Sequence, residues 1–214
     1  AVLDSNFEGR RRLDPDTLIC PQSGAAALRA AGAAVAGVDA VMKGETSTVF
    51  CAVRPPGHHA TADAAMGFCL INSVAVAAAY ALDRHGLERV AIVDFDVHHG
   101  NGTQAIFYNE PRVAYFSTHE SGIYPFTGSP YERGVGNVLN ALLPPGTGGF
   151  RFRNVWLDSM LPALDAFRPQ LLLISAGFDA HMRDPLADLM LETEDFGWLT
   201  RELRTIANRH ASGK

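Results

Sequence analysis

Residues 91–102, AIVDFDVHHGNG, place two acids and two histidines at the end of an apolar run. Because burying unpaired charge is costly, something at the end of this run must use or neutralise these side chains. In an extended segment, residues i and i+2 point to the same side, so Asp96 and His98 could bind one ion together. Asp179, which follows another apolar run, is the candidate third ligand. Two carboxylates and one imidazole leave open coordination positions, as a catalytic zinc requires to polarise a carbonyl and activate a water.

A second group is the histidine pair His58 and His59, which follows a Pro-Pro-Gly turn. The backbone can turn there, so one or both imidazoles could act as general base and acid beside a metal. Asp94 and Asn101 are candidates to orient these rings, because a hydrogen bond to one ring nitrogen fixes the tautomer of a histidine.

Each of these groups also has an ordinary structural explanation. A histidine pair in a loop is often structural, Asp94 could cap a turn, and Asp179 could be a loop acid or a helix cap. What favours catalysis is their joint placement at the ends of predicted strands, which the separate explanations do not account for. Other residues are more typical of local hydrogen bonding, small core side chains or turn glycines: His99, His119 and His181; Cys51 and Cys69; Gly57, Gly100, Gly102 and Gly177.

Apolar, β-branched runs alternate with helix-prone segments along the chain. Strands are expected at 48–55, 89–95, 113–118 and 170–176, and helices at 23–43, 68–84, 103–109, 152–167 and 193–209. Strands that are apolar on both faces predict an α/β fold with a central, mainly parallel sheet and helices on both faces. In such sheets ligands bind beyond the carboxyl ends of the strands, which is where the candidate residues lie.

Composition narrows the class of protein. The 214 residues, 47% of them hydrophobic and 19% charged, are typical of one folded domain and exclude a disordered chain. The net charge of −5 argues against a nucleic-acid surface, and we expect no apolar run long enough to span a membrane. Three well-separated cysteines give no disulfide framework, which is typical of a reducing cytoplasm.

Four segments resemble one known family. RPPGHHA (54–60), GFCLINSVAVAA (67–78), DFDVHHGNGTQAIFY (94–108) and SAGFDAHMRDPLA (175–187) are similar to the zinc-dependent histone deacetylase superfamily. Within it they look most like the class II and bacterial histone deacetylase-like amidohydrolases, with acetylpolyamine amidohydrolases as near relatives. The resemblance implies the arginase–deacetylase fold and hydrolysis of N-acetyl amides, most directly of N-acetyl-lysine in proteins.

The resemblance also implies the roles of the candidate residues. Zinc would be bound by Asp96, His98 and Asp179. His58 and His59 would be the catalytic pair, with Asp94 supporting His58 and Asn101 supporting His59. Class I relatives carry an acid in place of Asn101, which points this chain toward class II.

Further residues match the substrate and potassium positions of the family. Phe68 and Tyr124 would wall the acyl-lysine tunnel, with Gly177 at its floor and Gly57 also contacting substrate. A structural potassium ion would lie near Asp94, Asp96, His98, Ser117 and Thr118. A second such site would be formed by backbone near Phe107 and Val113.

One family feature has no counterpart. The catalytic tyrosine of the family lies in a Gly-Gly-Tyr motif, and none of the five tyrosines here has a matching context. We therefore expect residues 1–214 to be a single deacetylase domain truncated at both ends, and this fragment to be weak or inactive. The partner would be an acetylated lysine peptide or protein, or an acetylated polyamine, and a homo-oligomer is possible. A non-catalytic binding module and an arginase-like two-manganese hydrolase are the alternatives.

Overall fold

The computed structural model describes residues 2–3 and 7–214 of the chain. The chain divides into two compact units, Ala1–Gly86 with Asn101–Ile106, and Leu87–Gly100 with Phe107–Lys214. Each unit has a hydrophobic cluster of its own. A single domain over the whole chain therefore stays a prediction.

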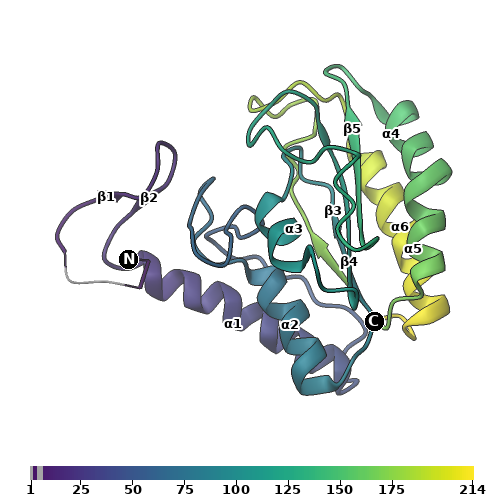
Figure 1. Cartoon of the computed structure of the whole chain (residues 1–214), viewed down its shortest axis with the longest axis horizontal. Coiled ribbons are helices and arrows are strands. Elements are labelled where there is room, and N and C mark those ends of the chain that lie inside the picture. The colour runs from purple at the N-terminus through teal and green to yellow at the C-terminus, as the bar shows by residue number, and fades with distance from the viewer. Residues whose placement is uncertain (1, 4–6) are drawn as a thin grey trace. The chain divides into compact units, whose positions relative to one another are not determined.

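The first unit is built on two helices that pack against each other, α1 (Ser23–Met42) and α2 (Ser73–His85) (Figure 1). Both are rich in alanine, which has the highest helix propensity and lets helix backbones approach closely. At the end of α1, Asp39 accepts hydrogen bonds from the Tyr80 hydroxyl and from His85 Nε2 of α2, each 2.9 Å long. The helix predicted at 23–43 is confirmed, whereas the one predicted at 68–84 begins later.

Helix α1 corrects one expectation from the sequence. The expectation that no segment is long and apolar enough to span a membrane was wrong, because the 20 residues of α1 meet that test by length and composition. A core helix of a soluble protein can pass the same test, and α1 packs against α2. The apolar character of α1 is therefore weak evidence for a membrane segment.

Two short elements of the first unit differ from expectation. A hairpin of β1 (Arg11–Arg12) and β2 (Leu18–Ile19) pairs antiparallel near the N-terminus. It was not predicted, because strands of two residues are too short to carry a hydrophobic period. Helix α3 (Asn101–Phe107) was expected at 103–109 and starts earlier.

The segment 48–55 forms no strand, and Val53 N–H donates to the Cys51 carbonyl (3.0 Å) in a tight turn, so this prediction was wrong. Its apolar residues are largely exposed, with Phe50 at 75%. Val49 lies against Gly37 of α1, and Cys51 Sγ donates a hydrogen bond to the Ala33 carbonyl (3.5 Å). An apolar run becomes a strand only when a neighbouring strand pairs with its backbone, and none does so among the described residues.

The second unit contains a four-stranded parallel sheet in the order β5-β4-β3-β6 (Figure 1). Its strands are β3 (Val90–Asp94), β4 (Val113–Glu120), β5 (Val138–Leu143) and β6 (Leu171–Ser175). The strands predicted at 89–95, 113–118 and 170–176 are confirmed. β5 was missed, because its buried and partly exposed residues alternate and Asn140 interrupts the apolar run. The predicted α/β class with a central parallel sheet is confirmed.

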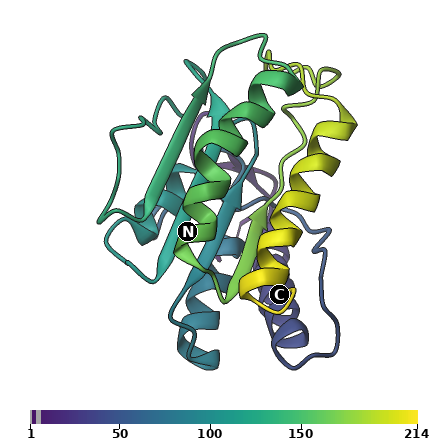
Figure 2. The same cartoon turned by 90° about the vertical axis from the view of Figure 1, so that its right-hand side faces the viewer.

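Helices cover one face of this sheet, as Figure 2 shows. The helix predicted at 152–167 is a continuous run of α4 (Gly149–Val155), a π-helical turn (Trp156–Met160) and α5 (Leu161–Phe167). Helix α6 (Thr193–His210) follows β6 and starts with a capping box between Glu192 and Asp195. Trp156, Leu164 and Leu199 are fully buried between these helices and the sheet.

The first testable prediction concerns Asn72, the buried N-cap of α2. Its Oδ1 accepts a hydrogen bond from Ala75 N–H (3.1 Å), and its Nδ2 donates to the Ala60 carbonyl and the Thr103 hydroxyl, 3.1 Å each. We expect Asn72→Ala to lower the free energy of unfolding by about 2 kcal/mol, because buried partners lose their bonds. Urea unfolding measures this.

Ser73→Ala is the matched control. Ser73 Oγ is buried next to Asn72 and has no hydrogen-bond partner among the described residues. Removing it should leave stability unchanged or raise it slightly. Equal losses in the two variants would contradict the role assigned to Asn72.

Candidate active site

Three potential metal ligands meet at the ends of two neighbouring strands of the second unit. β3 and β6 pair in parallel with Asp94 opposite Ser175, so the segments that follow them leave the sheet side by side. His98 Nδ1 lies 3.1 Å from Asp96 Oδ1 and 3.0 Å from Asp179 Oδ2. One potential ligand atom from each residue lies within 4.8 Å of the others. The convergence expected from the sequence is therefore present.

The electrostatics of this group suit a cation. Burial acts to lower the pKa of His98, but hydrogen bonds to Asp179 and Asp96 outweigh it and raise this pKa to about 10. The imidazole is thus held as a cation between two carboxylates. A divalent ion placed among the same oxygen and nitrogen atoms would take over this neutralising role, so the donor set fits such an ion.

Backbone groups and a glycine hold the group in place. Val97 N–H donates to Asp179 Oδ1 (3.0 Å), and His98 N–H donates to Asp96 Oδ1 (2.8 Å). Gly177 lies directly against the Asp96 carboxylate, where a Cβ atom would collide with it. The glycine that the sequence suggested for a tunnel floor therefore has a packing reason of its own.

Asp94, the last residue of β3, is fully buried, and its Oδ1 accepts a hydrogen bond from Asp96 N–H (3.3 Å). The Tyr115 hydroxyl donates to Asp94 Oδ2 (3.0 Å) and accepts a hydrogen bond from Gly100 N–H (3.1 Å). Burial, followed by the Asp94 charge, raises the pKa of Tyr115 well above its ordinary value, so the hydroxyl remains a donor. Sequence reasoning missed Tyr115, whose position inside a strand reads as core. The expected support of His58 by Asp94 stays a prediction.

The residues expected around potassium lie near this aspartate in the sheet register. Asp94 pairs with Ser117, whose hydroxyl lies 2.9 Å from His119 Nδ1. Thr118 Oγ1 is buried and has no hydrogen-bond partner among the described residues. A potassium ion there stays a prediction.

At the second cation site expected near Phe107 and Val113, a side chain of the protein donates hydrogen bonds to the backbone carbonyls. Asn137 Nδ2 donates to the carbonyls of Phe107 (2.8 Å), Glu110 (3.1 Å) and Val113 (2.8 Å). The two N–H groups of this amide are shared among the three carbonyls, and backbone N–H groups of Glu110 and Val113 also bond to the carbonyls of Phe107 (3.0 Å) and Glu110 (3.1 Å). The second cation site also stays a prediction.

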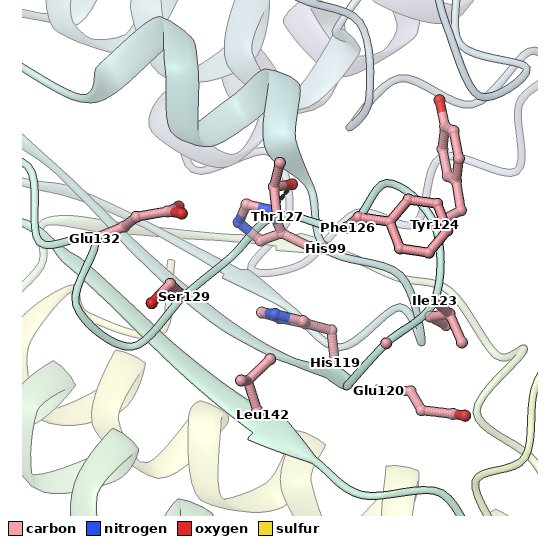
Figure 3. Close-up of a pocket in the computed structure, with 11 residues that line it drawn as sticks. His99, His119, Glu120, Ile123, Tyr124, Phe126, Thr127, Ser129, Glu132 and Leu142 are labelled. Carbon is pink, nitrogen blue, oxygen red and sulfur yellow. Dashed lines mark hydrogen bonds between the residues drawn. The ribbon is translucent and has the colours of Figure 1, made fainter.

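A cavity of about 260 Å³ lies under the 121–137 loop of the second unit (Figure 3). His99 and His119 face it, with their ring centroids 4.8 Å apart. His99 Nδ1 lies 2.8 Å from the Thr127 hydroxyl, and His119 Nε2 lies 3.2 Å from the Gly128 carbonyl. Both histidines make the local hydrogen bonds that their sequence positions suggested. Tyr124 also lines the cavity, and its ring centroid lies 6.5 Å from that of His98.

In the first unit, His58 and His59 are buried with their ring centroids 4.0 Å apart. His59 Nδ1 lies 2.8 Å from Asn101 Oδ1, at the start of α3. Asn101 Nδ2 donates to the His59 carbonyl (3.4 Å), which leaves the amide oxygen toward the ring. Because that oxygen can only accept, His59 Nδ1 carries the proton and Nε2 has the lone pair that a general base needs. The predicted pairing of Asn101 with His59 is present.

The loop that carries the histidines depends on two close backbone approaches. A Cβ atom at Gly57 would collide with the backbone of residues 71–73, and one at Gly102 with the backbone of His59 and Ala60. Gly57 is therefore explained by packing at the start of α2, and its contact with substrate stays a prediction. Phe68 lies near this loop in the sequence and is 59% exposed.

Comparison with known proteins identifies the family. Residues 3–214 match the histone deacetylase domain. The chain belongs to the histone deacetylase family. The crystal structure of the HDA15 HD domain matches with a TM-score of 0.91 and 36% identity, over 96% of this chain and 60% of that one. The arginase–deacetylase α/β fold is thereby confirmed.

Named relatives include enzymes from bacteria and animals. The chain is 44% identical over 211 residues to the histone deacetylase-like amidohydrolase of Pseudomonas aeruginosa, covering 96% of this chain and 56% of that protein. It is 41% identical over 203 residues to the polyamine deacetylase HDAC10 of Rattus norvegicus, covering 90% of this chain and 34% of that protein. This deacetylase-family chain thus spans about half, or less, of these two relatives.

A second prediction tests the glycine beside the metal-ligand group. We expect Gly177→Ala to weaken Zn²⁺ binding by more than tenfold, because the new Cβ displaces the Asp96 carboxylate. Calorimetric titration of the metal-free protein with Zn²⁺ measures this. Gly148→Ala is the control, since its Cβ would lie 3.6 Å from the Met190 carbonyl oxygen in an ordinary contact. Unchanged Zn²⁺ affinity in Gly177→Ala would contradict the arrangement.

A third prediction concerns pH. Burial, with the nearby His99, lowers the pKa of His119 from 6.5 to about 3. Below pH 6.5 the unfolded chain therefore binds a proton that the folded protein does not, and stability is lost as the pH falls from 6.5 toward 3. By pH 5 this single group should cost about 2 kcal/mol. His119→Gln, which cannot be protonated, should flatten the dependence of the unfolding free energy on pH between 5 and about 6.5, and an unchanged slope would contradict the assignment.

Proposed function

We propose that this chain carries the metal-ligand and histidine groups of a zinc-dependent hydrolase of N-acetyl amides, acting most directly on N-acetyl-lysine in proteins. The observation that carries the proposal is the convergence of Asp96, His98 and Asp179 on one point, in a chain of the histone deacetylase family. A binding module that only keeps the fold has no need of two carboxylates around one imidazole, because desolvating these charges in a partly buried site is costly.

The ion would be held by Asp96, His98 and Asp179. When bound, zinc supplies Lewis-acid chemistry, polarising an amide carbonyl and lowering the pKa of a water. The three protein ligands leave coordination positions for substrate, as catalytic zinc sites do and closed structural sites do not. Potassium near Ser117 and Thr118 is proposed as a structural ion only.

The histidine pair would move the protons. His59, with Nδ1–H directed to Asn101, offers Nε2 to take a proton from the attacking water. A protonated histidine of the pair then donates a proton to the leaving nitrogen, which breaks the C–N bond and gives acetate and a free amine. We assign the support of His58 to Asp94 by family resemblance.

The substrate class has one specific competitor. A relative with 41% identity is named a polyamine deacetylase, so an acetylated polyamine or another small amide is the second candidate. We propose no nucleic-acid or membrane partner. None of the three cysteines forms a disulfide within the described residues, in keeping with the cytoplasmic location we propose.

A fourth prediction separates these readings. Full-length protein is assayed with an acetyl-lysine peptide and with acetylputrescine, beside this chain alone. We expect a higher kcat/KM for the peptide than for acetylputrescine, and loss of activity after zinc removal. In His59→Ala, kcat/KM for the peptide should fall by about 10²–10⁴-fold. His85→Ala, at a histidine bonded to Asp39 of α1, is the control.

Different outcomes point to different functions. Preference for acetylputrescine would move the assignment to a polyamine deacetylase. Full-length protein that holds no stoichiometric zinc and hydrolyses neither substrate would leave the non-catalytic binding module.

A further inference from the structure

The segment Met66–Cys69 of the first unit is a two-residue hairpin turn with an unusual residue at its tip. Met66 N–H donates to the Cys69 carbonyl (3.1 Å) and Cys69 N–H donates to the Met66 carbonyl (2.9 Å). Both central residues have positive φ, 55° at Gly67 and 65° at Phe68. Such turns are dominated by glycine, asparagine and aspartate, so phenylalanine at the second central position is strained.

Phe68 is 59% exposed, so packing of its ring against the described residues does not account for this strain. The backbone is held instead. Phe68 N–H donates a hydrogen bond to the Thr17 hydroxyl (3.1 Å), and Thr17 is buried. The two residues are 51 positions apart in the sequence, so the bond ties the N-terminal hairpin to the turn.

Thr17 is itself fixed by a compact clasp, the segment 13–17 between β1 and β2. Asp14 Oδ1 accepts hydrogen bonds from Thr17 N–H (2.6 Å) and Asp16 N–H (2.8 Å), and Leu13 N–H donates to the Thr17 carbonyl (2.8 Å). Burial opposes ionisation of Asp14, but hydrogen bonds from Asp16 N–H, from the Thr17 hydroxyl and N–H, and from Gly67 N–H lower its pKa. A charged Asp14 therefore binds both the clasp and the turn.

The other side of the turn is anchored to the histidine loop. Cys69 is fully buried, and its Sγ accepts a hydrogen bond from His59 N–H (3.5 Å). Asn101 Nδ2 lies 3.4 Å from Met66 Sδ. The turn is thus held at its base by groups around His59 and at its tip by Thr17. The backbone from which the Phe68 ring projects is therefore fixed.

We infer that Thr17 is a positioning residue that sets specificity: its hydroxyl holds the Phe68 backbone in the left-handed conformation that presents the ring to the alkyl stem of an acylated amine. This inference rests on the proposed function, because the role of the Phe68 ring as a tunnel wall is part of that function. The ligand class is a linear alkyl amine acylated at nitrogen, whose methylene stem packs on a flat aromatic face.

The fifth prediction compares Thr17→Val, which removes the hydroxyl at nearly constant shape, with Thr17→Ser, which keeps it. In the full-length protein, Thr17→Val should raise KM for an acetyl-lysine peptide about fivefold with kcat within about twofold, the effect of one hydrogen bond that positions a binding group. Thr17→Ser should stay within about twofold of the unchanged protein. If Thr17→Val does not fold, Thr17→Ala takes its place.

A double-mutant comparison separates positioning from general damage. Glycine adopts positive φ without strain and has no ring, so in a Phe68→Gly background Thr17→Val should change KM by less than about twofold. Equal KM values for Thr17→Val and the unchanged protein would overturn the inference. So would a fivefold change that persists in the Phe68→Gly background.

A second measurement does not depend on activity. Hydrogen exchange at the Phe68 amide should be faster in Thr17→Val than in Thr17→Ser or the unchanged protein, because only the valine variant lacks the acceptor. If the protein hydrolyses neither substrate, the proposed function fails. Hydrogen exchange then still tests whether the Thr17 hydroxyl holds the Phe68 backbone. Equal exchange in all three proteins would end the inference even for an active enzyme.

Discussion

The group around His98 depends on one electrostatic constraint, that two carboxylates cannot share a partly buried site without a positive charge between them. Asp96 and Asp179 both lie within about 3 Å of the same imidazole nitrogen. Parallel pairing of β3 and β6 delivers them to this point, and backbone N–H groups fix one oxygen of each. The free-energy cost of bringing these charges together is therefore offset by folding of the sheet, without a bound ion. An ion then replaces a proton rather than organising the site.

Much of this arrangement could be predicted from the sequence. β3, β4 and β6 are continuous apolar runs, and central parallel strands must have such runs because both faces are covered. Once these strands are aligned, their carboxyl ends fall together, so Asp96, His98 and Asp179 follow from position alone. The pairing of Asn101 with His59 was also within reach, because an oriented imidazole needs a partner on its second nitrogen.

The rest depends on contacts that a local pattern does not contain. Residues 48–55 have the composition of a strand, but no neighbouring backbone pairs with them in the described chain. β5 contains Asn140 and alternates in burial, so its place at the sheet edge is decided by β4 rather than by its own residues. Tyr115 reads as a core residue until its hydroxyl is seen on Asp94. The left-handed backbone of Phe68 could not be predicted from its neighbours in the sequence, because the Thr17 hydroxyl that holds it lies 51 residues earlier.

The amide behind His59 has a consequence beyond orientation. A carboxylate in the place of Asn101 would gain a proton in acid and would pull a proton toward itself from the ring. The amide does neither, since it carries no ionisable group between the extremes of the biological pH range. The partner of His59 Nδ1 therefore keeps the same character at any pH, and whenever the ring is neutral the lone pair lies on the other ring nitrogen.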